Sequence, residues 1–87
     1  MKLRLISIMT GISAKSGKRY TRITVRGKKT DGGSSLADFW LKEEVAQRMF
    51  ADGISEDCWI ALVMDLDEET LRPYVSFVEK VNEEDVD

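Results

Sequence analysis

The segment that most constrains the fold is residues 19–26, in which polar and apolar side chains alternate without interruption. Thr21, Ile23 and Val25 fall on one face of an extended chain. The opposite face takes four polar side chains: Tyr20, Arg22, Thr24 and Arg26. A period of two is typical of a β-strand with one buried and one exposed face. The segment therefore predicts a strand whose outward face carries two guanidinium groups and a phenol.

Four further segments have the length and composition of strands, and one has the pattern of a short helix. The predicted strands are 3–9, 34–41, 58–66 and 71–81, and the predicted helix is 42–50. Leu41, Val45 and Met49 lie four residues apart on one helix face, and Gly53 is placed to cap the helix in a left-handed conformation. Glycine and serine in residues 10–18 predict a long mobile loop.

The predicted order is three strands, one helix and two strands within 87 residues, which is enough for one small domain. This is the order of the OB-fold, a partly open Greek-key barrel that commonly binds oligonucleotides. We therefore expect a mainly β, five-stranded OB-fold-like Greek-key barrel, with one short helix between strands 3 and 4. The domain is expected over 1–81 and an acidic C-terminal tail over 82–87. Other small barrels share part of this order, so the order alone proves no function.

Charge is distributed very unevenly along the chain. The net charge is −3, yet residues 31–87 hold all 16 acidic residues and only four basic ones. Residues 1–30 contain no acid and nine basic residues: Lys2, Arg4, Lys15, Lys18, Arg19, Arg22, Arg26, Lys28 and Lys29. Such a basic region can concentrate a polyanion. The alternative is a folded dipole whose two halves neutralise each other.

Side chains that usually support catalysis are scarce. The chain has no histidine, its single thiol is Cys58, and it has no glycine-rich phosphate loop with a lysine. This composition excludes an internal disulfide framework and a cysteine zinc knuckle. Carboxylates at 65–69 could attract a divalent cation, but they lack the spacing of a calcium loop, so a solvated turn is preferred. We expect no enzymatic activity, no metal and no cofactor.

No segment predicts insertion into a membrane or export. The longest apolar stretch, residues 59–64, is too short to cross a bilayer. The N-terminus has Arg4 among its apolar residues and no small-residue cleavage site, unlike a signal peptide. A single cysteine fits a reducing compartment. The expected location is the cytoplasm, that of the host cell if a phage encodes the chain.

Residues 13–22 combine flexible glycine and serine with lysine, arginine and a tyrosine ring. Single-stranded nucleic acid is bound by this pairing of a positive groove with aromatic platforms. The matching positions of a Ser/Thr-x-Lys-x-Gly-Lys-x-Tyr pattern are Ser13, Lys15, Gly17, Lys18 and Tyr20. Here the sequence resembles the loop and second strand of small phage-type single-stranded DNA-binding proteins, among them the filamentous-phage helix-destabilising proteins.

This resemblance implies an OB-fold, single-stranded DNA as the ligand, a homodimer, and replication or recombination proteins as partners. It covers about ten residues, and the rest of the chain matches in length and strand order. The predicted helix is a departure from the all-strand filamentous-phage form, and it is similar to bacterial single-stranded DNA-binding proteins. The acidic tail lacks the apolar tip with which the tail of those bacterial proteins ends, so self-shielding of the basic groove or solubility is its preferred role.

Aromatic rings beyond Tyr20 must come from later strands. Phe39 and Trp40 are adjacent, so one of them points outward, and an outward ring on the third strand would extend the platform of Tyr20. Trp59 lies in an apolar run and is expected in the core, and Tyr74 is expected to be an ordinary edge residue. The predicted nucleic-acid-binding residues are Lys15, Lys18, Arg19, Tyr20, Arg22, Arg26, Lys28 and Trp40.

The sequence thus predicts sequence-independent binding of single-stranded DNA in the replication or recombination of a phage or mobile element. The basic side chains would neutralise phosphates while the rings stack on bases. RNA stays open as a ligand, because no reader of the 2′-hydroxyl can be recognised. The alternative from another class is a phage accessory module that binds a basic host protein through its acidic face.

Overall fold

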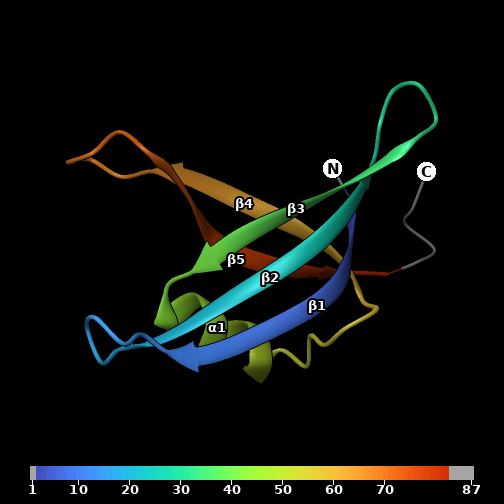
Figure 1. Cartoon of the computed structure of the whole chain (residues 1–87). Helices are drawn as coiled ribbons and strands as arrows, with labels where there is room; N and C mark the ends of the chain where they lie inside the picture. The colour runs from blue at the N-terminus through green and yellow to red at the C-terminus, as the bar shows by residue number, and fades with distance from the viewer. Residues whose placement is uncertain (1, 83–87) are drawn as a thin grey trace.

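The computed structural model describes residues 2–82, which form five strands and one helix (Figure 1). In chain order they are β1 (Leu3–Ile12), β2 (Arg19–Lys28), β3 (Ser34–Leu41), α1 (Glu43–Ala51), β4 (Trp59–Leu66) and β5 (Pro73–Val81). The predicted mainly β fold, with one short helix between the third and fourth strands, is confirmed. Apart from Asn82, the predicted acidic tail lies outside the described residues. Within 2–82, no helix has the length and apolar character that crossing a membrane requires.

The strands form one open sheet in the order β3-β2-β1-β4-β5, and every neighbouring pair is antiparallel. The central strand β1 pairs with β2 over most of its length, but it pairs with β4 only at Leu3 and Arg4. A β-bulge between Leu5 and Ser7 bends β1 at the point where it leaves β4. The sheet curls enough that parts of β3 and β5, its two edge strands, come within contact distance.

The concave side of the sheet holds the core, and α1 packs on it against β2 and β5 (Figure 1). Leu5, Ile23 and Ile60 are fully buried on the inward faces of the three central strands. Met49 of α1 is also fully buried, and Leu41 and Val45 are buried with it, so the predicted helix face is confirmed.

The first loop differs from the prediction. β1 continues to Ile12, three residues beyond the predicted end, because Thr10, Gly11 and Ile12 pair with the start of β2. Only residues 13–18 remain as a loop, and they are closed by hydrogen bonds that the backbone N–H of Ser13 and of Gly17 donate. The predicted long loop over residues 10–18 is therefore wrong: residues 10–12 belong to β1, and residues 13–18 form a short hairpin turn.

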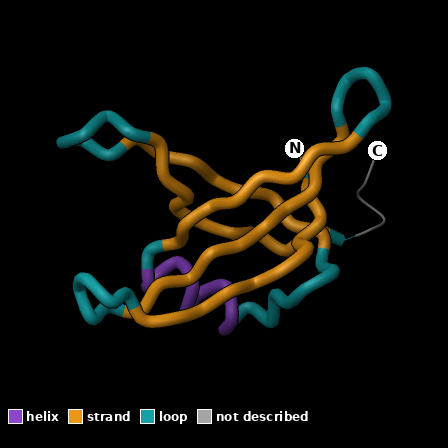
Figure 2. Tube along the Cα trace, viewed as in Figure 1, coloured by secondary structure: helices purple, strands orange, loops and turns teal. Residues whose placement is uncertain are grey.

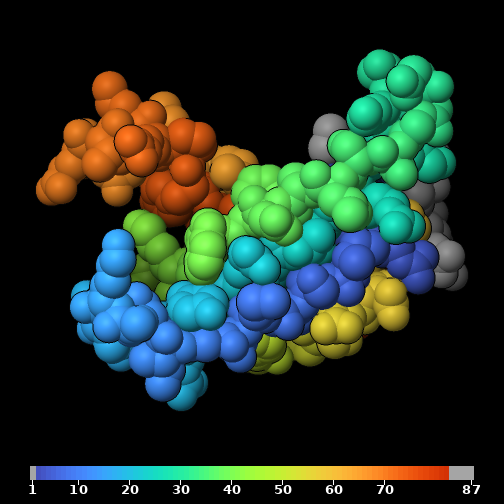
Figure 3. Space-filling model, viewed as in Figure 1, coloured from blue at the N-terminus to red at the C-terminus, as the bar shows by residue number. Residues whose placement is uncertain are grey.

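The hairpin loops sit at opposite ends of the sheet (Figure 2). The β1–β2 loop and the β4–β5 loop, residues 67–72, lie at one end, and the β2–β3 loop, residues 29–33, lies at the other. The first two loops project on either side of the end of β3 (Figure 3). The last residues of β3 are therefore flanked by a basic loop and an acidic one.

Candidate nucleic-acid interface

The polar side chains that the alternation in β2 predicts to face outward lie on the outward side of β1, β2 and β3. We call this side the outer face, and its strands are the blue, cyan and green surface in Figure 3. Side chains that pair across antiparallel strands lie on the same face. On β3, the partners of Arg22, Thr24 and Arg26 are Trp40, Asp38 and Leu36. On β1, Met9 pairs with Arg22 and Gly11 pairs with Tyr20.

Tyr20 and Trp40 form an aromatic cluster at one end of the outer face. Their ring centroids are 5.3 Å apart and the ring planes are inclined at 61°, an edge-to-face arrangement. Trp40 remains 62% exposed, so most of its surface is open to a ligand. The guanidinium of Arg22 lies 5.7 Å from the centre of the Trp40 ring and donates a hydrogen bond to Met9 Sδ at 3.5 Å. A charge and two rings are thus held together at the surface.

Gly11 determines where the Tyr20 ring lies. A Cβ atom on Gly11 would stand only 2.5 Å from the Tyr20 hydroxyl oxygen and 2.7 Å from Cζ. The ring therefore lies directly over the backbone of β1, in the space that the missing side chain leaves. Gly11 on one side and Trp40 on the other hold Tyr20 in place.

Two arginines face each other farther along the same side. Arg4 of β1 pairs directly with Arg26 of β2, and like charges in directly opposed positions are destabilising. Arg4 also pairs with Trp59 of β4, and its guanidinium lies 5.5 Å from the centre of the Trp59 ring. Between described residues the only ion pair is Arg48–Asp52, at 3.3 Å, away from this side. Arg4, Arg22 and Arg26 form no ion pair with a described carboxylate.

One acid lies among these cations. Asp38 of β3 is opposite Thr24, whose hydroxyl donates a hydrogen bond of 2.6 Å to its carboxylate. The hydrogen bond is local, and Asp38 makes no ion pair with a described residue. Asp38 is therefore the one acid among the outward-facing residues of β2 and β3.

The lysines of the predicted site lie at the two ends of β2. Lys15 and Lys18 are exposed in the β1–β2 loop, at the Trp40 end. Lys28 is exposed at the other end, where it pairs with Ser34. The structure therefore brings Tyr20, Arg22 and Trp40 into contact, while the lysines extend the positive surface beyond them in both directions.

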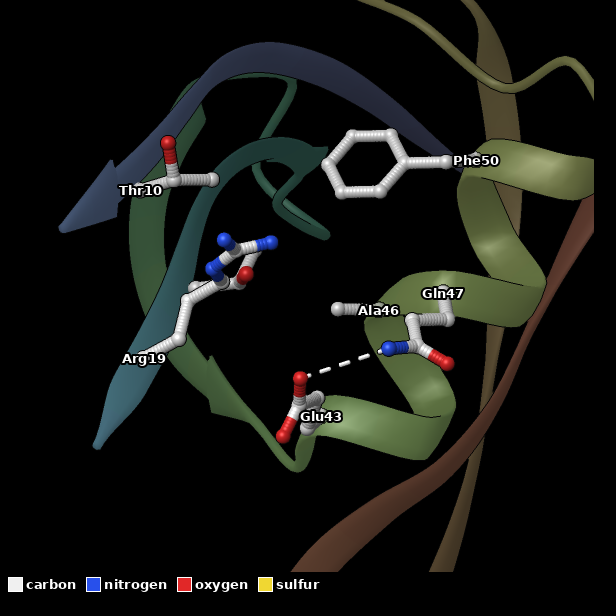
Figure 4. A pocket seen from close by; sticks show the side chains of 7 residues that line it. Thr10, Arg19, Glu43, Ala46, Gln47 and Phe50 are labelled. Carbon is white, nitrogen blue, oxygen red and sulfur yellow. Dashed lines mark hydrogen bonds between the residues drawn. The ribbon is translucent and has the colours of Figure 1, made fainter. Parts of the chain in front are cut away.

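Arg19 does not join the other predicted residues. It precedes Tyr20 on β2 and so lies on the opposite side of the strand, where it lines a pocket of about 300 Å³. Figure 4 shows its guanidinium pointing into this pocket, between Thr10 of β1 and the ring of Phe50 of α1. The Gln47 amide donates a hydrogen bond of 3.3 Å to the Glu43 carboxylate. The alternation in residues 19–26 carries this signal, because it puts Arg19 on the face opposite to Tyr20 and Arg22.

The prediction from the sequence that Trp59 lies in the core is wrong. The apolar run around it predicts a core position, but the side chain is half-buried, outside the core cluster, and stacked with Arg4. Its neighbour Ile60 is the fully buried residue of this strand. Because residues 58–64 are almost all apolar, they carry no alternation from which the direction of Trp59 could be read.

Two further aromatic residues, Phe39 and Tyr74, take structural positions. Phe39 packs against the core, which leaves Trp40 as the outward ring of that adjacent pair. Tyr74 on the edge strand β5 is half-buried, and the ammonium of Lys42 lies 4.0 Å from the centre of its ring. Neither ring takes part in the Tyr20–Trp40 cluster.

No cluster of potential metal ligands assembles in the described part of the chain. Residues 2–82 contain no group of three or more carboxylate or cysteine ligands placed to hold a metal ion. Asp67 instead organises its turn, since its carboxylate accepts backbone hydrogen bonds from Glu69 at 2.9 Å and Thr70 at 3.1 Å. Hydrogen bonding to the backbone of Ser55 lowers the pKa of the Cys58 thiol, which is half-buried.

The chain matches no protein-family model, no curated protein and no solved structure.

Proposed function

We propose that this chain is a non-enzymatic protein that binds single-stranded DNA on its outer face, with little preference for base sequence. The observation that carries this proposal is the exposed cluster of Tyr20, Trp40 and Arg22, on a face whose arginines have no described carboxylate partner. Aromatic rings beside unneutralised cations provide both parts of single-strand recognition, namely stacking for bases and charge for phosphates.

An OB-type barrel is the finer fold that we propose with this function. The strand order β3-β2-β1-β4-β5, the helix between β3 and β4 and the approach of β3 to β5 all support it. OB-folds bind oligonucleotides on the face of strands 2 and 3, between the loops that follow strands 1 and 4. Tyr20, Arg22 and Trp40 occupy that face, and those two loops flank the end of β3.

In this mechanism each base stacks on a ring while the adjacent phosphates contact the cations. Every base has a π-face, so stacking on Trp40 and Tyr20 discriminates little between sequences. Phosphate contacts fix the path of the strand without reading bases. A protein of this kind would coat single strands during the replication or recombination of a phage or mobile element, as its resemblance to phage-type proteins implies.

Binding to poly(dT) at several salt concentrations tests this proposal. If about four to six phosphates are neutralised, log affinity falls with log salt at a slope of about −3 to −4. Arg22→Ala lowers affinity and flattens this slope by under about one unit, while Arg19→Ala, the matched control on the opposite side of β2, changes both less. A slope near zero, or equal effects of the two variants, contradicts binding on the outer face.

Variants of Tyr20 separate stacking from charge in the same assay. Tyr20→Ala loses a ring worth about 1–3 kcal/mol per stacked base, whereas Tyr20→Phe keeps the π-face and binds almost normally. Thermal melting shows whether each variant is folded. A folded Tyr20→Ala protein that binds like the wild type refutes stacking at this position. Poly(rU) is titrated in parallel, and tighter binding to it would reassign the ligand to RNA.

A second candidate function is supported by the β4–β5 hairpin. Leu71 is 72% exposed and has a left-handed φ of 58°, a conformation that costs a non-glycine residue about 1–2 kcal/mol. Leu66, at the end of β4, is also exposed, and residues 65–69 contain four carboxylates. Residues with a strained backbone conformation often lie at functional contacts. These features fit the alternative in which the acidic face binds a basic host protein.

That candidate predicts a different sensitivity to mutation. Leu71→Gly relieves the backbone strain and removes the exposed apolar side chain that would contact the partner. The variant would therefore no longer bind a basic partner protein. The same variant would leave poly(dT) binding unchanged. Tight poly(dT) binding that is lost on Leu71→Gly would contradict this division of roles.

A further inference from the structure

We infer that a bound single strand crosses the sheet from Trp40 to a second stacking platform, Trp59, by way of Arg26 and Arg4. This inference rests on the proposed single-stranded DNA binding, and it adds a path and two contact residues, Arg4 and Trp59, to it. The two platforms would lie on different pairs of strands, Trp40 with β2 and β3, and Trp59 with β1 and β4.

The two ends of the path are built alike. At one end Arg22 lies 5.7 Å from the centre of the Trp40 ring, and at the other end Arg4 lies 5.5 Å from the centre of the Trp59 ring. In each pair the two residues are direct cross-strand partners, so the ring and the charge point to the same side. An arginine held beside an indole presents a phosphate contact next to a stacking surface.

Arg26 connects these two ends. It is two outward positions beyond Arg22 on β2 and is the direct partner of Arg4 on β1. Like charges at directly opposed positions of two strands are destabilising, and neither arginine forms an ion pair with a described carboxylate. A phosphate between Arg4 and Arg26 would convert this repulsion into two attractions. The unfavourable pairing is therefore the feature of the free protein that a polyanion would relieve.

The acidic β4–β5 loop favours the same direction. It projects beside the end of β3, so a strand that leaves Trp40 toward β5 would meet the carboxylates of residues 67–69. A strand that leaves Trp40 across β2 and β1 meets Arg22, Arg26 and Arg4 in turn. Like-charge repulsion on one side and attraction on the other select the second path.

The length of this path sets a minimum ligand. Arg22 and Arg26 are four residues apart, about 13 Å along the strand, and β3 and β4 are separated by three strand spacings, about 14 Å. The diagonal over a flat sheet is roughly 19 Å. A stacked strand advances about 3.4 Å per nucleotide, so about six stacked nucleotides, or fewer extended ones, reach from one platform to the other.

The two tryptophans of the chain allow a direct test by fluorescence, because each can be observed alone. Trp40→Phe leaves Trp59 as the only indole, and Trp59→Phe leaves Trp40. Both variants keep an aromatic ring at the changed position. Each is titrated with poly(dT) at low salt, and its affinity is measured independently by gel shift. Acrylamide quenching of the remaining tryptophan, with and without poly(dT), reports whether bound DNA shields the ring.

The inference predicts that Trp59 fluorescence in Trp40→Phe changes in step with the gel shift and that poly(dT) protects Trp59 from acrylamide. The Arg4→Gln variant keeps both tryptophans. It should bind poly(dT) more weakly than the wild type, and its salt slope should be flatter by about 0.7. If Trp40 responds while Trp59 keeps its full acrylamide quenching, the second platform is wrong and the proposed function stands. If the wild type does not bind poly(dT), the proposed function fails and the path fails with it.

Discussion

Replacing Gly11 with alanine should disturb the outer face without changing any charge or any predicted contact residue. The new Cβ would lie within 2.9 Å of three atoms of the Tyr20 side chain, closer than carbon atoms approach in folded proteins. Trp40 stands on the other side of Tyr20, with ring centroids 5.3 Å apart. The Tyr20 ring must therefore rotate away from β1, and in doing so it leaves its position against Trp40.

The expected size of this effect follows from three contributions to the free energy of unfolding. Alanine in place of a strand glycine stabilises by about 0.5–1 kcal/mol. Forcing Tyr20 off its rotamer costs about 0.5–1.5 kcal/mol, and losing the edge-to-face pair costs a similar amount. Gly11→Ala should therefore destabilise the wild type by about 0.5–2 kcal/mol.

The sign should reverse when Tyr20 is absent. In a Tyr20→Ala background the new methyl group meets no ring, so only the favourable glycine-to-alanine contribution remains, about 0.5–1 kcal/mol of stabilisation. The two backgrounds then differ by about 1–3 kcal/mol, a coupling large enough to measure for residues in contact. Urea unfolding of the four proteins of this cycle gives the coupling directly.

Binding to poly(dT) by the same four proteins connects the geometry to the proposed function. Gly11→Ala should weaken binding by up to the value of one stacked base, about 1–3 kcal/mol or 5- to 150-fold in Kd. In the Tyr20→Ala background it should have no further effect. A stability change of the same sign in both backgrounds refutes the packing of Tyr20 on Gly11. Unchanged binding by a folded Gly11→Ala protein refutes the need for the ring at that position.

Three further changes test separate parts of the structure. Gly27→Ala places a Cβ 2.9 Å from the Cδ2 atom of the buried Leu3, and should lower the free energy of unfolding by about 1 kcal/mol in urea titrations. Asp38→Asn removes the acid from the outer face and keeps a hydrogen-bond acceptor, so it should tighten poly(dT) binding about two- to five-fold at low salt and less at high salt; weaker binding would instead show that the carboxylate contacts the ligand. Backbone hydrogen bonds from Thr70 and the preceding residue lower the pKa of Asp67, so its contribution to stability is present above the ordinary aspartate pKa and disappears as the pH falls through the lowered value. Thermal melting from about pH 5 to pH 2 should show a smaller loss of stability for Asp67→Ala than for the wild type, and identical pH profiles would contradict this role.

Local sequence was sufficient where a side chain's direction follows from its own strand or helix. The alternation in residues 19–26 placed Ile23 and Val25 in the core and Arg22 outside it, and the four-residue spacing in α1 placed Val45 and Met49 against the sheet. Gly53 takes the left-handed φ of 75° that its position after the helix required. These features depend on residues within one turn or one strand of each other.

The sequence also predicted part of the candidate site. Nine of the 13 basic residues lie in residues 1–30, and β2 presents Tyr20 and Arg22 on one side because their spacing is two. Their apposition with Trp40 depended on how β3 pairs with β2, since adjacent Phe39 and Trp40 point in opposite directions and either could have faced outward. The observed register puts Trp40 opposite Arg22 and Phe39 opposite Ile23.

The amino-acid sequence by itself determined the strands, the helix, and which face of β2 is polar, because a period of two or four residues fixes direction locally. Only the tertiary structure decided which residues of different strands meet. In an uninterrupted β1, Arg4 and Gly11 would point to opposite sides, since they are seven residues apart. The bulge between Leu5 and Ser7 changes that phase, so Arg4 pairs with Arg26 and Gly11 pairs with Tyr20 on the same outer face. A bulge arises from pairing with neighbouring strands, so the sequence of β1 alone carries no sign of it. The path from Trp40 through Arg26 and Arg4 to Trp59 therefore exists only once the sheet has formed.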